Sequence, residues 1–220
     1  MIRQMSIVVI GILGVFAAST LILAQPISST VEDFLDVINA DVNVKPNDRL
    51  DARVETAGEI PEDGSGGAFG YGILSNDGDA VIVATTHGGV LDSEEQDDAS
   101  DPIMHTHLVA LETGSDECGD DFKVDQITFE SPGMVNIAPS DRALLRNVPT
   151  DEFEATNVDV PGTEDTPIEL GGDITLTAGT DVQDVVSFVL EPIFDGDDIE
   201  AICVTNVESA DNVEVMQPSN

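Results

Sequence analysis

Short apolar runs of strand length follow one another from Ala68 onward, and turn residues separate them. Examples of these separators are Asn76-Asp77-Gly78, Ser131-Pro132-Gly133 and Asp195-Gly196. Many short strands with Gly and Pro between them are typical of an antiparallel sandwich or barrel. The sequence therefore predicts an all-β fold, an antiparallel β-sandwich or a barrel of short strands. The predicted strands are Ala68–Leu74, Ala80–Thr86, Ile103–Leu111, Phe122–Phe129, Met134–Ala138, Ala143–Val148, Phe153–Val160, Asp173–Thr177, Val185–Phe194 and Ile199–Val207.

The part of the chain before these runs has a different pattern. Ser29–Glu32 has the spacing of a capping box, and the apolar residues that follow share one helical face, which predicts an amphipathic helix. Those residues are Val31, Phe34, Leu35 and Ile38. Asp41–Asp63 is polar and is predicted to be an arm with at most one short strand, near Leu50–Val54. We therefore divide the chain into a leader (1–24), a helix and polar arm (25–67) and a β-sandwich domain (68–220).

The amino terminus has the features of an export signal. Arg3 precedes an uncharged apolar stretch, Ile7–Ala24, with small residues at its end, as in secretory signals. Cleavage after Ala24 would release the rest of the chain, whereas an uncleaved stretch would act as a membrane anchor. Either way the remainder is predicted to be extracellular or on the cell surface. Contact with the membrane is expected only through residues 7–24, if they are retained.

Cysteine use agrees with export. Cys118 and Cys203 are the only cysteines, and an even number in an exported chain predicts a disulfide. The alternative, a pair of thiolate metal ligands, requires further ligands that two separate cysteines do not supply. We therefore predict a bridge between these two residues.

The charge of the chain is strongly negative. Asp and Glu number 44 against 7 Lys and Arg, which gives a net charge of −37. Such a charge destabilises a compact state in dilute buffer, but in molar salt the Debye length falls to about 3 Å. A salt-adapted protein with an acidic surface is the simplest interpretation. Nucleic acid is excluded as a partner because no Lys/Arg cluster occurs in the sequence.

All three histidines of the chain lie close together in the sequence. His105 and His107 alternate on one predicted strand, so their side chains share a face. If Ala80–Thr86 pairs antiparallel with this strand, His87 lies near His105. Three imidazole nitrogens are a suitable donor set for Zn²⁺ or Cu²⁺ with an open fourth position. The alternative is that these are ordinary polar residues of the fold.

Other functional motifs are weak. The chain has no Gly-x-Ser-x-Gly elbow, no phosphate-binding Gly loop after a strand and no His-Glu-x-x-His. Acidic loops such as Asp92–Asp98 and Asp195–Asp198 lack the ligand order of a calcium loop, which favours solvated loops. No catalytic residue and no organic cofactor can be assigned from these patterns.

One stretch shows a resemblance to a family. THGGVLDSEEQDDASDPIMHTHLVALETGSDECGDD, which begins at Thr86, and the following VDQITFESPG resemble an uncharacterised family of exported archaeal proteins. The resemblance covers about 50 residues and implies a secreted or cell-surface archaeal protein, without a mechanism. It includes all three histidines and Cys118.

Two functions remain open at this point. The first is a non-catalytic extracellular or cell-surface β-sandwich protein of a salt-adapted archaeon, which is structural or binds a ligand, a protein or another cell-envelope partner. The alternative is a Zn- or Cu-dependent module or enzyme that uses His87, His105 and His107. The two differ in whether the three imidazoles converge.

Overall fold

The computed structural model describes residues 32–88, 102–128, 131–155, 174–196 and 198–218. This part of the chain is all-β, as predicted, and contains no helix. Accordingly, no helix of the described residues is long and apolar enough to cross a membrane. The expected leader lies outside the described residues. The strands are β1 (Val37–Lys45), β2 (Arg49–Thr56), β3 (Phe69–Ser75), β4 (Val81–Thr85), β5 (His105–Thr113), β6 (Phe122–Ile127), β7 (Met134–Ile137), β8 (Arg142–Pro149), β9 (Glu152–Ala155), β10 (Ile174–Thr177), β11 (Val182–Asp195), β12 (Asp198–Ser209) and β13 (Val213–Met216).

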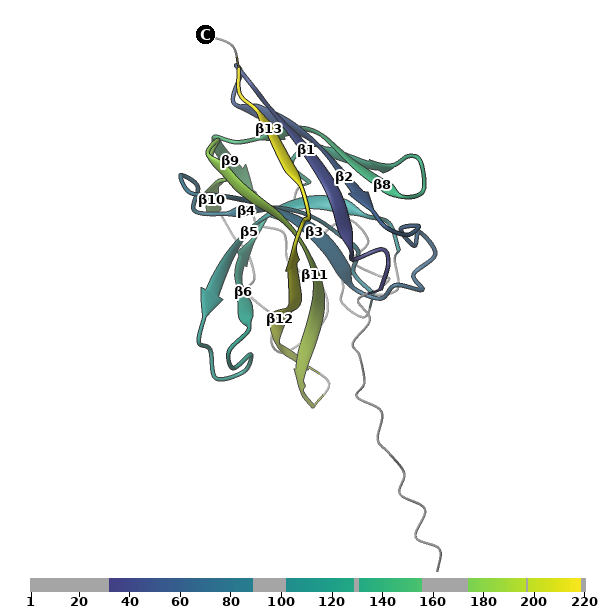
Figure 1. Cartoon of the computed structure of the whole chain (residues 1–220). Coiled ribbons are helices and arrows are strands. Elements are labelled where there is room, and N and C mark those ends of the chain that lie inside the picture. The colour runs from purple at the N-terminus through teal and green to yellow at the C-terminus, as the bar shows by residue number, and fades with distance from the viewer. Residues whose placement is uncertain (1–31, 89–101, 129–130, 156–173, 197, 219–220) are drawn as a thin grey trace, which may run out of the picture. The chain divides into compact units, whose positions relative to one another are not determined.

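Six strands close into a barrel in the order β11-β12-β6-β5-β4-β3, and neighbouring strands are antiparallel (Figure 1). Alternate side chains of these strands form an apolar cluster that fills the barrel interior. Gly70 of β3 makes room for this packing, because a Cβ there would lie 2.7 Å from the ring of Phe188. The interior is therefore a packed core. It consists of Val83, Val109, Val124, Val186, Phe188, Ile202 and Val204.

A second sheet has the order β13-β1-β2-β8-β7, and β13, β1, β2 and β8 are labelled side by side in Figure 1. Its inward side chains, such as Val42, Leu50 and Leu145, belong to one core with residues on the outer face of the barrel, such as Tyr71 and Leu108. This core is larger than the barrel interior, and it makes the described strands a two-layer structure. The remaining strands, β9 and β10, pair with each other.

The prediction of an amino-terminal helix is wrong for the residues that the structure describes, from 32 onward. Asp33–Leu35 forms a turn, and the strand β1 begins at Val37. The segment expected to be a polar arm contains most of β1 and all of β2, which form an antiparallel hairpin. The apolar residues of these strands alternate with polar ones, and the larger core buries them, so sheet pairing prevails over the local capping signal.

The predicted strands from Ala68 onward are confirmed, with shifts of a few residues at their ends. Residues 129, 156–160 and 173, which belong to three of the predicted strands, lie outside the described residues. The prediction omitted β13, which is short and mostly exposed and pairs parallel to β1. A short strand that buries little apolar surface has no clear alternation in sequence.

The disulfide between Cys118 and Cys203 is present in the structure, with a Cα–Cα distance of 5.5 Å. It joins the turn between β5 and β6 to the middle of β12. β6 and β12 are paired in the barrel through only two residue pairs, one of which contains Cys203. The bridge therefore reinforces the strand pairing of the barrel that has the fewest residue pairs. A disulfide is compatible with an extracellular protein.

Candidate metal centre

The pairing of β4 with β5 brings the three histidines together, as the sequence predicted. The two strands are antiparallel, and Thr85 lies opposite His105 while Val83 lies opposite His107. His87 follows β4 by two residues and reaches the same place. His105, His107 and Val109 occupy every second position of β5, so their side chains lie on the same face of the strand. That face points to the barrel interior, because Val109 belongs to the interior core. The histidines thus lie at one end of the interior core.

The three rings are in contact and buried. The ring centroids of His87 and His105 are 4.7 Å apart, and the two planes are nearly parallel, at 4°. His107 lies edge-on to both, with centroid distances of 5.4 Å to His87 and 4.6 Å to His105. One nitrogen from each ring can be chosen so that all three nitrogens lie within 4.8 Å of one another. The arrangement is a compact cluster of nitrogen donors.

Backbone carbonyls fix the orientation of two of the rings. Nδ1–H of His107 donates to the carbonyl oxygen of Thr128 at 2.6 Å, and Nδ1–H of His105 donates to that of Ile103 at 3.2 Å. A carbonyl oxygen only accepts, so each Nδ1 carries the proton and each Nε2 carries the lone pair in the neutral ring. Histidines that bind a metal through one ring nitrogen usually donate the other ring N–H to a carbonyl or carboxylate oxygen in this way.

His87 has a different environment. Both of its ring nitrogens are buried without a hydrogen-bond partner among the described residues, and so is Nε2 of His105. Burial, with a smaller contribution from His105, lowers the pKa of His87 to about 3. The ring is therefore neutral at ordinary pH and has a free lone pair. A buried polar atom without a partner costs about 1–3 kcal/mol, so three such nitrogens require an explanation.

The donor set fits a transition-metal ion after a small contraction. A tetrahedral ion with metal–nitrogen bonds near 2.0–2.1 Å holds its nitrogens about 3.3 Å apart, so the widest separation must close by roughly 1.5 Å. His105 and His107 are held by their carbonyl bonds. No hydrogen bond to a described residue holds His87, so a movement of its ring toward the other two would break none.

Sequence reasoning found the three imidazoles but missed the two carbonyl groups that orient them. Every residue has a backbone carbonyl, so the sequence contains no signal for those of Ile103 and Thr128. The acidic turn at Asp77 has a structural role, because one carboxylate oxygen accepts the N–H groups of Thr180 and Asp181. Asp92–Asp98 lies outside the described residues.

No protein-family model, no curated protein and no solved structure matches this chain. The resemblance to exported archaeal proteins stays a prediction.

Proposed function

We propose that this chain is an exported, non-catalytic β protein that binds one Zn²⁺ or copper ion through His87, His105 and His107. The observation that supports it best is the cluster of three buried imidazoles with nitrogens within 4.8 Å of one another. Buried imidazoles that serve only as packing would leave the nitrogens of His87 unsatisfied, whereas a bound ion would pair with one of them.

The orientation of the rings adds support. Both strand histidines direct a proton-bearing Nδ1 to a backbone carbonyl, which leaves Nε2 as the donor atom in each case. A neutral ring is the form that binds a metal, and the lowered pKa of His87 preserves that form.

Binding is favoured over catalysis for this site. Catalytic zinc sites keep a fourth position open to water and substrate. Here all three rings are buried, and the adjoining barrel interior is packed with apolar side chains. Three imidazoles leave a fourth position on the ion, but burial keeps a substrate away from it, so we assign the ion a structural role and propose no reaction.

Isothermal titration calorimetry in 2 M NaCl tests the proposal. We expect saturable binding of one Zn²⁺ or Cu²⁺ per chain, because molar salt screens diffuse attraction to the carboxylates but not coordination by imidazole. His87→Phe should weaken binding at least a hundredfold. It retains an aromatic ring against His105 and breaks no hydrogen bond to a described residue, so the variant should still fold. His107→Ala should have the same effect on binding.

Glu112→Gln is the matched control. Glu112 lies on the same strand as His105 and His107 but is exposed, so its loss should leave affinity within about twofold. If the unaltered protein shows no saturable binding of either ion, the histidines are structural residues and the proposal fails. Equal weakening by Glu112→Gln and His87→Phe would identify counter-ion attraction and contradict it as well.

A further inference from the structure

Basic side chains are concentrated on one face of this acidic protein. The chain has seven Lys and Arg residues, and five of them lie on the outward positions of β1, β2 and β8. They are Lys45, Arg49, Arg53, Arg142 and Arg146. The same face of the five-stranded sheet has four outward acidic residues, Asp41, Asp51, Glu55 and Glu214, so its local charge is +1. The chain as a whole has a net charge of −37, so the rest of it has a charge of −38.

Three of these cations form ion pairs within the sheet, whereas Arg49 and Arg146 form none within 4.0 Å among the described residues. Arg53 pairs with Asp41 at 3.0 Å, Arg142 with Glu55 at 3.1 Å and Lys45 with Asp51 at 2.6 Å. Arg146 is exposed and forms no ion pair within 4.0 Å in the described part of the chain. Arg49 donates to the carbonyl oxygen of Asn147 at 3.3 Å. Asp51 is near enough to attract Arg146 electrostatically, but the exposed guanidinium makes no ion pair with it within 4.0 Å and can still reach an external carboxylate.

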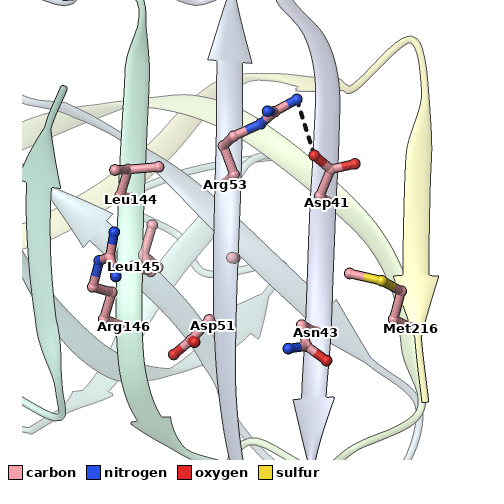
Figure 2. A pocket seen from close by; sticks show the side chains of 9 residues that line it. Asp41, Asn43, Asp51, Arg53, Leu144, Leu145, Arg146 and Met216 are labelled. Atoms are coloured by element: carbon pink, nitrogen blue, oxygen red, sulfur yellow. Dashed lines mark ion pairs between the residues drawn. The ribbon is translucent and has the colours of Figure 1, made fainter. Parts of the chain in front are cut away.

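A shallow groove crosses this face beside Arg146. Figure 2 shows two arginines and two aspartates on its lining, together with polar and apolar side chains. The labelled residues are Asp41, Asn43, Asp51, Arg53, Leu144, Leu145, Arg146 and Met216. Met216 on β13 is 55% exposed, and Met134, paired with Arg146 across β7 and β8, is 58% exposed. The face thus combines an available guanidinium with exposed apolar surface. That combination is enriched at protein–protein interfaces, where Arg and Met are over-represented.

We propose that the outer face of the β13-β1-β2-β8-β7 sheet binds an acidic polypeptide segment of a partner protein. A carboxylate of the segment pairs with the guanidinium of Arg146, and its apolar side chains cover Leu144 and Met216. Arg presents a planar fork that matches a carboxylate with two hydrogen bonds. Because five of the seven basic residues lie on this face, direct contacts with the carboxylates of a partner are available here and on little of the remaining surface.

A polypeptide fits the face better than a purely ionic polymer. In molar salt the Debye length is about 3 Å, so only charges in direct contact retain their attraction. Binding then requires apolar burial in addition to ion pairs, and the exposed methionines and Leu144 provide that surface. A sulfated polysaccharide has no apolar side chains, so it would leave those residues uncovered.

Fluorescence anisotropy in 1 M NaCl tests the proposal with a labelled synthetic peptide that is rich in Glu and contains two Leu residues. We expect saturable binding and at least tenfold weaker binding to Arg146→Glu. Because Arg146 is exposed and forms no ion pair within 4.0 Å among the described residues, this variant should keep the circular dichroism spectrum of the parent. Lys123→Glu is the matched control, with the same change in charge at a described basic residue outside the face, and it should change affinity less than twofold.

Several outcomes would overturn the proposal. These are no saturable binding, equal binding of a peptide with Gln in place of Glu, or equal weakening by Arg146→Glu and Lys123→Glu. Saturable binding of dextran sulfate but not of the peptide would also contradict it. Sedimentation of the protein alone provides the last test, because a dimer that Arg146→Glu dissociates would assign the face to a second copy of the chain.

Discussion

In dilute buffer the protein is expected to lose its folded structure, and in salt above about 1 M it is expected to fold cooperatively. Of the carboxylates in the described part of the chain, only Asp41, Asp51, Glu55, Glu117 and Asp141 lie within 4.0 Å of a basic nitrogen. The others repel one another without a compensating cation, and salt screens that repulsion. A circular dichroism titration from millimolar to 3 M NaCl measures the transition.

A charge-neutralised variant separates this mechanism from a specific effect of salt. Asp125→Asn, Glu152→Gln and Asp211→Asn remove three exposed carboxylates that form no ion pair in the described residues. The triple variant should fold at a lower salt concentration than the parent, because less repulsion remains to be screened. A parent spectrum that stays unchanged down to millimolar salt would refute salt-dependent folding.

The strands after Ala68 could be predicted because each one combines an apolar run with a strong turn signal at its end. The closed barrel was predicted only as an alternative to the sandwich. The choice depends on which strands are neighbours, and β3 meets β11 across more than 100 residues of sequence. Local patterns contain no information about pairing at that distance. The structure combines both arrangements, since the barrel packs its outer face against a second sheet.

The helix predicted near the amino terminus was wrong because two periodicities overlap in the same residues. Phe34, Leu35 and Ile38 fit a helical face, but Ala40, Val42 and Val44 alternate as in a strand. Alternation prevails because the larger core buries those three side chains almost completely. A tertiary contact of this kind overrides local helix propensity.

The histidine cluster could be predicted from the sequence because it needs only two neighbouring strands. His105 and His107 share a face by alternation, and the antiparallel pairing of β4 with β5 places His87 beside them. What the sequence does not contain is the burial of the cluster and the carbonyl bonds that fix the protons on Nδ1. Those features turn three nearby histidines into an oriented donor set.

Removal of the disulfide is expected to lower the free energy of unfolding by about 4 kcal/mol in the loop-entropy model. The bridge spans 85 residues of sequence, so the unfolded chain gains considerable freedom when it is cut. Cys118→Ser should show this effect with little else, because Cys118 is half-buried at a turn. Thermal unfolding in 2 M NaCl measures the loss, and a reducing agent should lower the melting temperature of the parent in the same way.

Cys203→Ser should be more destabilising than Cys118→Ser, although both cut the same bond. Cys203 is buried on β12 with an exposed fraction of 3%, so the new hydroxyl would lie in an apolar setting at a cost of about 1–3 kcal/mol. The difference in the free energy of unfolding between the two variants therefore measures the effect of the buried environment of Cys203. The loss of unfolding free energy that both variants share measures the effect of the covalent link between the turn and the barrel. If two free thiols react quantitatively in the native protein, or if reduction leaves the melting temperature unchanged, the bridge does not stabilise the fold.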